Sequence, residues 1–212
     1  PGAVIKTLIE KNKSPKIATL PTFTGGLVGY FSYDYIKYSE PTLKLDAEDQ
    51  EHFKDVDLML FDKVIAYDNY RQKIVLMINI ETENLEENYE KAVQELEKME
   101  DLIRFGKPAE TKAGHLESEF RPLFDEKAYC EKVEQVKHYI HEGDLFQLVL
   151  SNRLEADFEG SLLDTYRVLR TTNPSPYMFY FSSDDVEIAG ASPETLVKVE
   201  DGEVRTFPLA GT

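Results

Sequence analysis

This sequence has a single cysteine, no long apolar run and no apolar segment among its first residues, and each of these features limits where we expect the protein to work. The single cysteine, Cys130, excludes a disulfide within the chain and is compatible with a reducing cytosol. No run of about eighteen apolar residues occurs, so we expect no membrane span. Residues 1–16 contain no apolar leader segment and begin without Met, which favours an internal start over a signal peptide. We therefore expect a cytoplasmic protein.

Positive charge is also scarce. The chain has 24 Lys and Arg residues against 40 Asp and Glu, which gives a formal net charge of −16. A surface with this excess would repel phosphates, so nucleic acid is an improbable partner. The glycines match neither the dinucleotide-binding pattern nor the P-loop, which leaves nucleotide binding with little support.

The 212 residues and the 42% hydrophobic fraction are enough for a sizeable core. Hairpin signals outnumber strand-helix-strand crossovers, so we predict an α+β fold with helices packed on a mainly antiparallel sheet. Apolar spacing predicts helices over 84–105, 125–141 and 161–171, and strands over 56–65, 73–80, 145–153, 177–182, 186–190, 195–199 and 203–207. Residues 106–122 have no apolar period and should form a loop. Asn84 and Ser161 are the expected helix caps.

The last predicted hairpin suggests a site. Its turn, Asp201-Gly202, favours a type I′ geometry that would fold the chain back and bring Glu194 close to residues 208–212. Gly211 would let backbone N–H groups approach an anionic ligand without a side chain in the way. An edge hairpin with a Glu and a Gly but no function explains these residues as well.

The polar residue Gln147 lies within the apolar run 145–153, on the face shared with Leu145, Val149 and Ser151. Such a side chain is either a satisfied core amide or one that faces a ligand, and the residues alone do not separate the two.

Another candidate, a metal site at Cys130, His138 and His141, is disfavoured because no close Cys pair is present. Two exposed histidines near a helix C-terminus are the simpler explanation.

Four segments resemble one family. GASPE (190–194), FPLAGT (207–212), GDLFQLVLSNR (143–153) and NPSPYMF (173–179) are similar to motifs of the chorismate-utilising enzymes, and within them to those of anthranilate synthase component I. The resemblance runs from about residue 16 to 212. It implies that 1–122 is the N-terminal region and that 123–212 is the first part of a truncated chorismate-binding catalytic domain, an incomplete form of the family's fold.

The resemblance also implies roles for individual residues. Glu194 would be the general acid that protonates the departing 4-hydroxyl of chorismate, held partly protonated by burial, and Gln147 would face the reaction centre. Backbone N–H groups at Ala210, Gly211 and Thr212 would hold a substrate carboxylate or developing charge. Pro176, Tyr177 and Met178 would form part of the pocket in which tryptophan inhibits, whereas the residues alone favour a double-proline helix exit that leads into an aromatic strand.

Sister activities differ from this pattern at two positions. Family members that add water carry Lys where this chain has Gln147, and aminodeoxychorismate synthases carry a nucleophilic Lys where it has Ala210. The combination fits direct attack by ammonia, which would give anthranilate and pyruvate in tryptophan biosynthesis. Aminodeoxychorismate synthase component I, a non-catalytic amino-acid-sensing module and a plain acidic scaffold remain the alternatives.

The resemblance implies a cofactor and a partner as well. Mg²⁺ would be bound by glutamates beyond Thr212, and a glutamine amidotransferase subunit would deliver the ammonia. Chorismate is a dianion, so a site on this acidic chain needs a divalent cation or local N–H donors. We therefore expect the 212-residue chain to be inactive alone.

Overall fold

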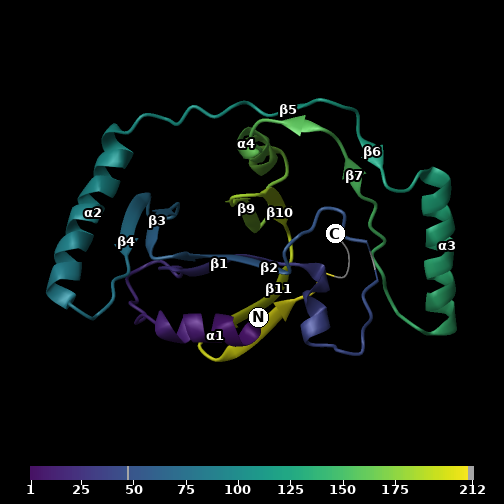
Figure 1. The fold of residues 1–212 in the computed structure, drawn as a ribbon, viewed down its shortest axis with the longest axis horizontal. Coiled ribbons are helices and arrows are strands. Elements are labelled where there is room, and N and C mark those ends of the chain that lie inside the picture. Colours follow the sequence, from purple (N-terminus) through teal and green to yellow (C-terminus); the bar gives the residue numbers. More distant parts are fainter. Residues whose placement is uncertain (47, 210–212) are drawn as a thin grey trace. The chain divides into compact units, whose positions relative to one another are not determined.

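The computed structural model describes residues 1–46 and 48–209, and its contacts divide the chain into two compact units, Pro1–Pro108 and Ala109–Thr212. Both units combine helices with small antiparallel sheets (Figure 1). The predicted α+β class with antiparallel pairing is thereby confirmed. The regions 1–122 and 123–212, which rest on family resemblance, remain a prediction. None of the described helices is both long enough and apolar enough to cross a bilayer.

The first unit begins with a helix and continues with short strands. Its elements are α1 (Gly2–Lys11), β1 (Gly26–Phe31), the 3₁₀ helix η1 (Tyr33–Tyr38), β2 (Val56–Phe61), β3 (Lys63–Asp68), β4 (Lys73–Ile78) and α2 (Leu85–Phe105). β1 pairs with β2 and β3 pairs with β4, both antiparallel. A side chain at Gly29 would collide with the backbone of Asp57 on β2, which explains the glycine in this strand.

The predicted strand 56–65 is wrong as a single element, because the chain breaks at Asp62 and continues as β3. The amide of Asn79 holds this break, since its backbone N–H and its Nδ2 donate to the Asp62 carbonyl at 2.7 and 3.2 Å. β3 and β4 form a hairpin whose turn lies between the predicted runs 56–65 and 73–80. Oδ1 of Asp68 accepts from the backbone N–H groups of Tyr70 and Arg71, an arrangement that an Asp at the start of a turn favours.

Helix α2 begins and ends close to the predicted positions and packs on β4. The predicted cap is wrong, because Asn84 has a left-handed backbone with φ of 52° and makes no side-chain capping bond. An ion pair, Lys63 Nζ to Glu95 Oε2 at 2.8 Å, ties α2 to β3 as well.

The second unit contains α3, α4 and several short strands. Its elements are β5 (His115–Leu116), β6 (Arg121–Pro122), α3 (Glu126–Glu142), β7 (Leu154–Glu155), β8 (Phe158–Glu159), α4 (Leu163–Thr172), β9 (Tyr177–Ser182), β10 (Glu187–Ser192), β11 (Thr195–Glu200) and β12 (Glu203–Phe207). β5 pairs with β8, β6 with β7, β9 with β10 and β11 with β12, all antiparallel. The predicted loop 106–122 therefore contains two short strands, each held by a partner distant in sequence.

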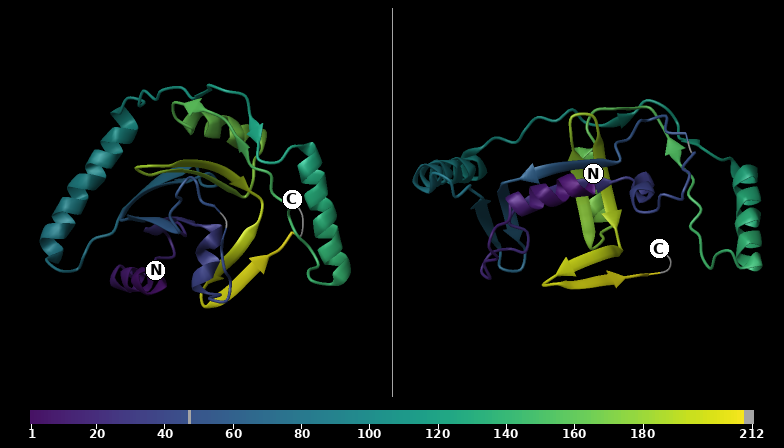
Figure 2. Two further views of the ribbon diagram at one scale, coloured as in Figure 1. Left: turned by 45° about the vertical axis from the view of Figure 1, so that its right-hand side comes forward. Right: turned by 60° about the horizontal axis from the view of Figure 1, so that its bottom comes forward.

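Helix α4 packs on the β9–β10 hairpin (Figure 2), and a carboxylate fixes its start. Glu187 accepts from the Leu162 N–H at 2.7 Å and from the Tyr180 hydroxyl at 2.7 Å. Ser161 Oγ accepts from the Leu163 N–H at 3.1 Å and also donates to Glu187 at 3.2 Å. The predicted cap Ser161 thus shares the helix start with a residue from β10.

Helix α3 follows its sequence signals: Asp125 caps it through the Ala128 N–H at 2.8 Å, and Gly143 ends it with φ of 84°. The run after it departs from prediction. Residues 145–153 form no strand, and Phe146 and Val149 are 100% and 81% exposed. The predicted interior strand is wrong for this chain, because the described residues supply neither a pairing strand nor a covering layer for it.

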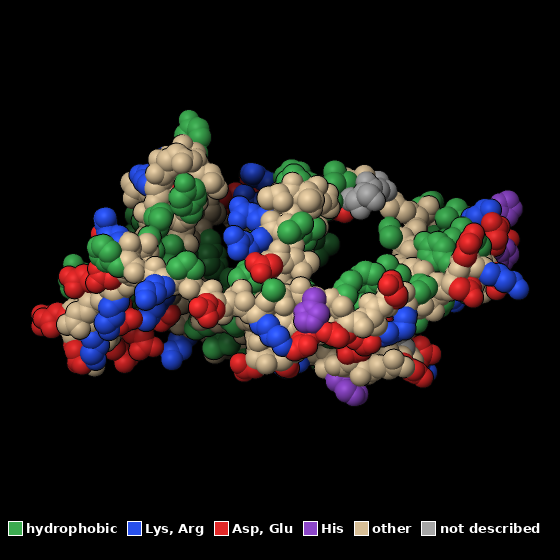
Figure 3. Space-filling view, turned by 90° about the horizontal axis from the view of Figure 1, so that it is seen from above, with side chains coloured by type: hydrophobic (Ala, Val, Ile, Leu, Met, Phe, Trp, Pro, Cys, Tyr) green, Lys and Arg blue, Asp and Glu red, His purple; other side chains and the backbone are tan. Residues whose placement is uncertain are grey.

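The buried core is small. Among the described residues, only Met77 in the first unit and Phe181 in the second are buried hydrophobic side chains. Many other large apolar side chains lie at the surface (Figure 3). The sequence provides enough apolar residues for a larger core, yet the described fold leaves most of them in contact with solvent.

Candidate functional site

The β11–β12 hairpin positions the predicted acid. Its turn residues Asp201 and Gly202 both have positive φ, 52° and 83°, as a type I′ turn requires. The Thr206 hydroxyl donates to the Leu196 carbonyl at 2.8 Å and helps to hold the two strands together. The hairpin therefore brings the segment after β12 back to the residue before β11, and the Leu209 N–H donates to Oε1 of Glu194 at 3.2 Å. The predicted approach of Glu194 to residues 208–212 is confirmed as far as Leu209, and residues 210–212 lie outside the described residues.

The immediate setting of Glu194 differs from prediction in one respect. Its side chain is exposed, so the burial that was expected to keep it protonated is absent from the described residues. The Ser192 hydroxyl lies 3.4 Å from both the Glu194 N–H and its carbonyl, which fixes the backbone at this corner. The corner is held in place, whereas the carboxylate is open to water.

A shallow hollow of about 430 Å³ adjoins Glu194. Its lining combines one acid, one base, two hydroxyls and an apolar wall: Tyr177, Glu194, Thr195, Leu196, Val197 and Lys198. The predicted donors Ala210, Gly211 and Thr212 lie outside the described residues, so the anion cradle remains a prediction. Leu209, whose N–H already faces Glu194, immediately precedes them.

Tyr177 opens β9 and enters the same hollow. Its hydroxyl lies 2.5 Å from Oγ1 of Thr195, the residue after Glu194. Sequence reasoning placed Tyr177 and Glu194 in separate sites, and it missed Thr195 because no local signal indicates a contact across eighteen residues. Pro176 is exposed and Met178 is half-buried, and because side chains alternate along a strand, Tyr177 and Met178 point to opposite faces of β9.

The other predicted catalytic residue lies elsewhere. Gln147 is exposed on the non-strand segment 145–153 and is not among the residues that line the hollow. The described chain therefore brings Glu194, Tyr177 and Thr195 together but does not add Gln147 to them.

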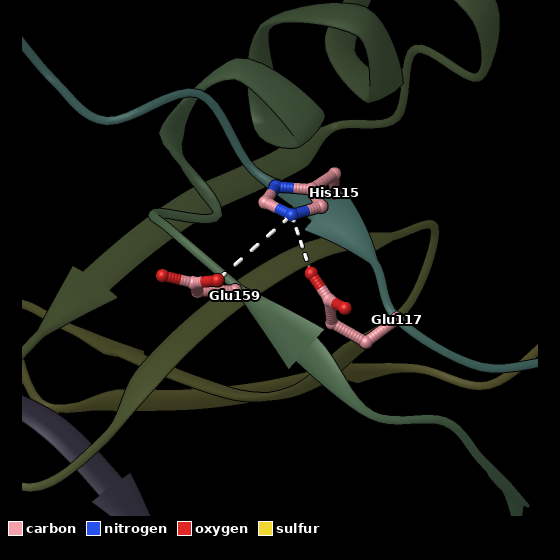
Figure 4. Close-up of side chains that lie close together, drawn as sticks. All are labelled: His115, Glu117 and Glu159. Atoms are coloured by element: carbon pink, nitrogen blue, oxygen red, sulfur yellow. Dashed lines mark ion pairs between the residues drawn. The ribbon is translucent and has the colours of Figure 1, made fainter.

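A separate polar cluster joins β5 to β8. His115 and Glu159 are opposite residues of this pair, and Glu117 is two residues after His115. His115 Nε2 lies 2.5 Å from Glu117 Oε1 and 3.9 Å from Glu159 Oε2 (Figure 4). All three side chains are exposed, and Lys112 forms an ion pair with Glu159.

Comparison with known protein families tests the family relationship that the four sequence motifs suggest. The model of the chorismate binding enzyme family matches residues 3–212, which is nearly the whole chain. The protein belongs to the chorismate-binding enzyme family.

Individual relatives in this family are similar over the same range. Anthranilate synthase component 1 of Aquifex aeolicus is 37% identical over 218 residues, which cover 100% of this chain and 44% of the relative. That of Acinetobacter calcoaceticus is 39% identical, covering 92% and 40%. The crystal structure of anthranilate synthase component I from Streptococcus pneumoniae TIGR4 matches with a TM-score of 0.76 at 31% identity, covering 94% and 46%. The chain thus spans less than half the length of these relatives.

Mg²⁺, the metal that the family resemblance implies, does not fit the described residues. Mg²⁺ prefers six oxygen ligands in octahedral geometry, and the cluster of His115, Glu117 and Glu159 offers a nitrogen and two exposed carboxylates, one of them paired with Lys112. At the other candidate metal site, that of Cys130, His138 and His141, His138 Nδ1 lies 4.0 Å from Glu142 Oε1 in an exposed i,i+4 pair. We assign no chemical step to a metal held by these residues.

Proposed function

We propose that this chain is the N-terminal and central part of an anthranilate synthase component I, in an incomplete chorismate-binding fold. The observation that carries the proposal is the match of 37% identity over the full chain, together with Gln147 and Ala210 at the two positions that distinguish sister activities. The complete enzyme converts chorismate and ammonia to anthranilate, pyruvate and water in the cytoplasm, as a step of tryptophan biosynthesis.

The departure of the carbon-4 hydroxyl is the step of the reaction that needs a proton donor. Ammonia adds at ring carbon 2, the carbon-4 hydroxyl leaves as water, and elimination of pyruvate then makes the ring aromatic. Hydroxide leaves poorly, so a general acid must protonate it, and Glu194 is the candidate because the hairpin holds its carboxylate at the hollow. Its side chain is exposed in the described chain, so the proposal requires that further polypeptide of the complete enzyme cover it.

Backbone donors supply the complementary anion site. The Leu209 N–H already points at Glu194, and Ala210, Gly211 and Thr212 continue the same segment. In the proposed site, the N–H groups of these three residues hold a carboxylate of chorismate, which offsets the net charge of −16 locally. Gln147 lies outside the hollow in the described chain; in the complete enzyme it would line the reaction centre without acting as a base, since ammonia is itself a nucleophile.

Tryptophan would inhibit the complete enzyme by feedback. Pro176, Tyr177 and Met178 would contribute to the inhibitor pocket, and support comes from the position of Tyr177 in a hollow. The same observation favours the alternative of a non-catalytic amino-acid-sensing module. Titration of the 212-residue chain and of Tyr177→Ala with tryptophan tests this alternative: tight binding that Tyr177→Ala abolishes, without turnover in the complete protein, supports a sensor.

The proposed complete enzyme needs a second subunit and a metal ion. A glutamine amidotransferase subunit, component II, supplies ammonia, because the lone cysteine here is an exposed residue on α3 and not part of an arrangement that could hydrolyse glutamine. Mg²⁺ would be held by residues beyond Thr212. The 212-residue chain should therefore be inactive alone.

The decisive experiment uses the complete enzyme that contains this segment, with chorismate, ammonium and Mg²⁺, and follows anthranilate fluorescence. Glu194→Gln should lower kcat by about 10²- to 10⁴-fold, the usual contribution of a general acid. Glu203→Gln, on the far strand of the same hairpin, is the matched control and should retain activity. An aminodeoxychorismate product would establish the sister activity instead, and turnover by the 212-residue chain would refute its proposed inactivity.

A further inference from the structure

Three side chains of the second unit converge away from the hollow at Glu194. His115 and Glu159 are directly opposite residues of the β5–β8 pair, and Glu117 lies two residues after His115, just beyond β5. Opposite residues of an antiparallel pair share one face of the sheet, and so do residues two apart along a strand. The imidazole and both carboxylates therefore lie together on that face (Figure 4).

The distances between the possible ligand atoms suit one small ion. A nitrogen of His115 and one oxygen from each carboxylate all lie within 4.8 Å of one another. His115 Nε2 is 2.5 Å from Glu117 Oε1 and 3.9 Å from Glu159 Oε2. Zn²⁺ binds imidazole nitrogen and carboxylate oxygen at about 2.0–2.2 Å in tetrahedral geometry, which places the ligand atoms about 3.3–3.6 Å apart. The observed distances lie on either side of this spacing.

The backbone beneath these side chains is fixed at both ends of the β5–β8 pair. The Glu117 N–H donates to the Asp157 carbonyl at 2.7 Å. At the other end, the Ser161 N–H donates to the Lys112 carbonyl at 3.1 Å. Gly160 has φ of 99°, and a side chain there would collide with the facing backbone, so the two chains approach closely. The three side chains thus project from a rigid element, as the ligands of a metal site should.

The combination of ligand atoms indicates which ion would bind. One imidazole and two carboxylates are ligands that Zn²⁺ accepts, with a fourth position left for water, whereas Mg²⁺ prefers oxygen atoms alone. An acidic patch without a histidine would attract any cation, but the imidazole favours a transition metal over Mg²⁺. We propose that His115, Glu117 and Glu159 bind Zn²⁺ and thereby clamp β5 to β8. The hollow at Glu194 shares none of these residues, so the zinc site takes no part in the reaction proposed above.

Lys112 competes with the metal ion for one of its ligands. The Lys112 ammonium forms an ion pair with Glu159, and it must leave this carboxylate before Zn²⁺ can bind there. Lys112→Met should therefore bind Zn²⁺ about 2- to 5-fold more tightly, the factor that corresponds to one exposed ion pair. Weaker binding in Lys112→Met would mean that Glu159 is not a ligand, and would overturn the site as proposed.

Isothermal titration calorimetry of the 212-residue chain with zinc chloride measures the site, and magnesium chloride supplies the comparison ion. One Zn²⁺ should bind per chain, and excess Mg²⁺ should not displace it. His115→Ala and Glu159→Gln should each weaken this binding by more than about 100-fold, since the loss of a residue that merely supports a ligand already costs about 10- to 100-fold. Zn²⁺ should also slow the backbone hydrogen exchange of residues 115–117 and 158–160 in the parent chain, but in neither variant.

His138→Ala is the matched control, because His138 is another exposed histidine with a glutamate 4.0 Å away, on α3. This variant should keep the stoichiometry and the affinity of the parent. The three ligands are exposed, so circular dichroism should show the parent's spectrum in every variant. Absence of Zn²⁺ binding, binding that persists in both His115→Ala and Glu159→Gln, binding lost in His138→Ala, or displacement by Mg²⁺ would each overturn the proposal. Anthranilate formation is not measured, so failure of the proposed reaction would leave this result unchanged.

Discussion

The hydroxyl of Tyr177 and Oγ1 of Thr195 lie 2.5 Å apart and tie the first residue of β9 to the first residue of β11. Thr195 directly follows Glu194, so this contact connects the predicted inhibitor segment with the predicted general acid. Each residue lies at the hollow, and each belongs to a different hairpin.

Loss of this contact should loosen the corner at Glu194. A hydrogen bond contributes about 0.5–1.5 kcal/mol net, which corresponds to about 2- to 10-fold faster amide exchange in residues 194–197 for Tyr177→Phe and for Thr195→Val. The double variant should be no worse than either single one, because both remove the same bond. Tyr166→Phe, on α4, is the control. Additive effects in the double variant would show that the two hydroxyls act separately.

The turn of the β11–β12 hairpin should depend on glycine at its second position. Gly202 has φ of 83°, where a Cβ costs about 1–2 kcal/mol, so Gly202→Ala should reduce the hairpin population about tenfold. Cross-strand nuclear Overhauser contacts between Val199 and Val204 measure this population. Asp201→Asn should have little effect, since Asn tolerates a left-handed backbone. Equal populations in the Ala variant and the parent would contradict the role of the turn.

The start of α4 should respond to acid. The Tyr180 hydroxyl, followed by the Leu162 N–H, lowers the pKa of Glu187 below its ordinary 4.5. A depressed pKa stabilises the fold above pH 4.5, and this contribution is lost as the pH falls through the lowered value. The amide ¹⁵N shift of Leu162 should titrate below pH 4.5. Glu187→Gln should remove this titration, whereas Glu203→Gln should keep it. A midpoint above 4.5 would reverse the assigned sign.

The link between α2 and β3 should also be visible by titration. Lys63, followed by Lys98, lowers the pKa of Glu95 from 4.5 to about 2. The pair therefore contributes at neutral pH and is lost as the pH falls from 4.5 toward 2. Carboxyl ¹³C titration should show Lys63→Met raising the pKa of Glu95, and Lys91→Met, on the same helix, leaving it unchanged. Because the pair is exposed, added salt should shrink the shift. An unchanged midpoint in Lys63→Met would exclude the ion pair.

Local patterns predicted most of the elements correctly. The helices α2 and α3 and the hairpins β3–β4, β9–β10 and β11–β12 follow from apolar spacing, turn residues and glycines, which act within a few residues. Capping was less predictable. Asn84 adopts a left-handed backbone, and the start of α4 depends on Glu187, a residue from a later strand.

In the candidate site as well, some features follow from the local sequence and others depend on tertiary contacts. The return of the chain to Glu194 follows from the Asp201-Gly202 turn, whereas the contact of Tyr177 with Thr195 requires two hairpins to be brought together. The failure of 145–153 to form a strand has the same origin. An apolar composition states a preference for burial, and only neighbouring strands and layers can satisfy that preference.

For this protein, the order of residues alone determined the family motifs, the acidic surface and the local elements, because propensity, turn chemistry and charge need no distant partner. Only the tertiary structure decided that Glu194 is exposed, that Tyr177 shares its hollow, and that the apolar run after α3 is uncovered. These properties depend on long-range packing, and the free energy that fixes them comes from surfaces that meet only in the folded chain.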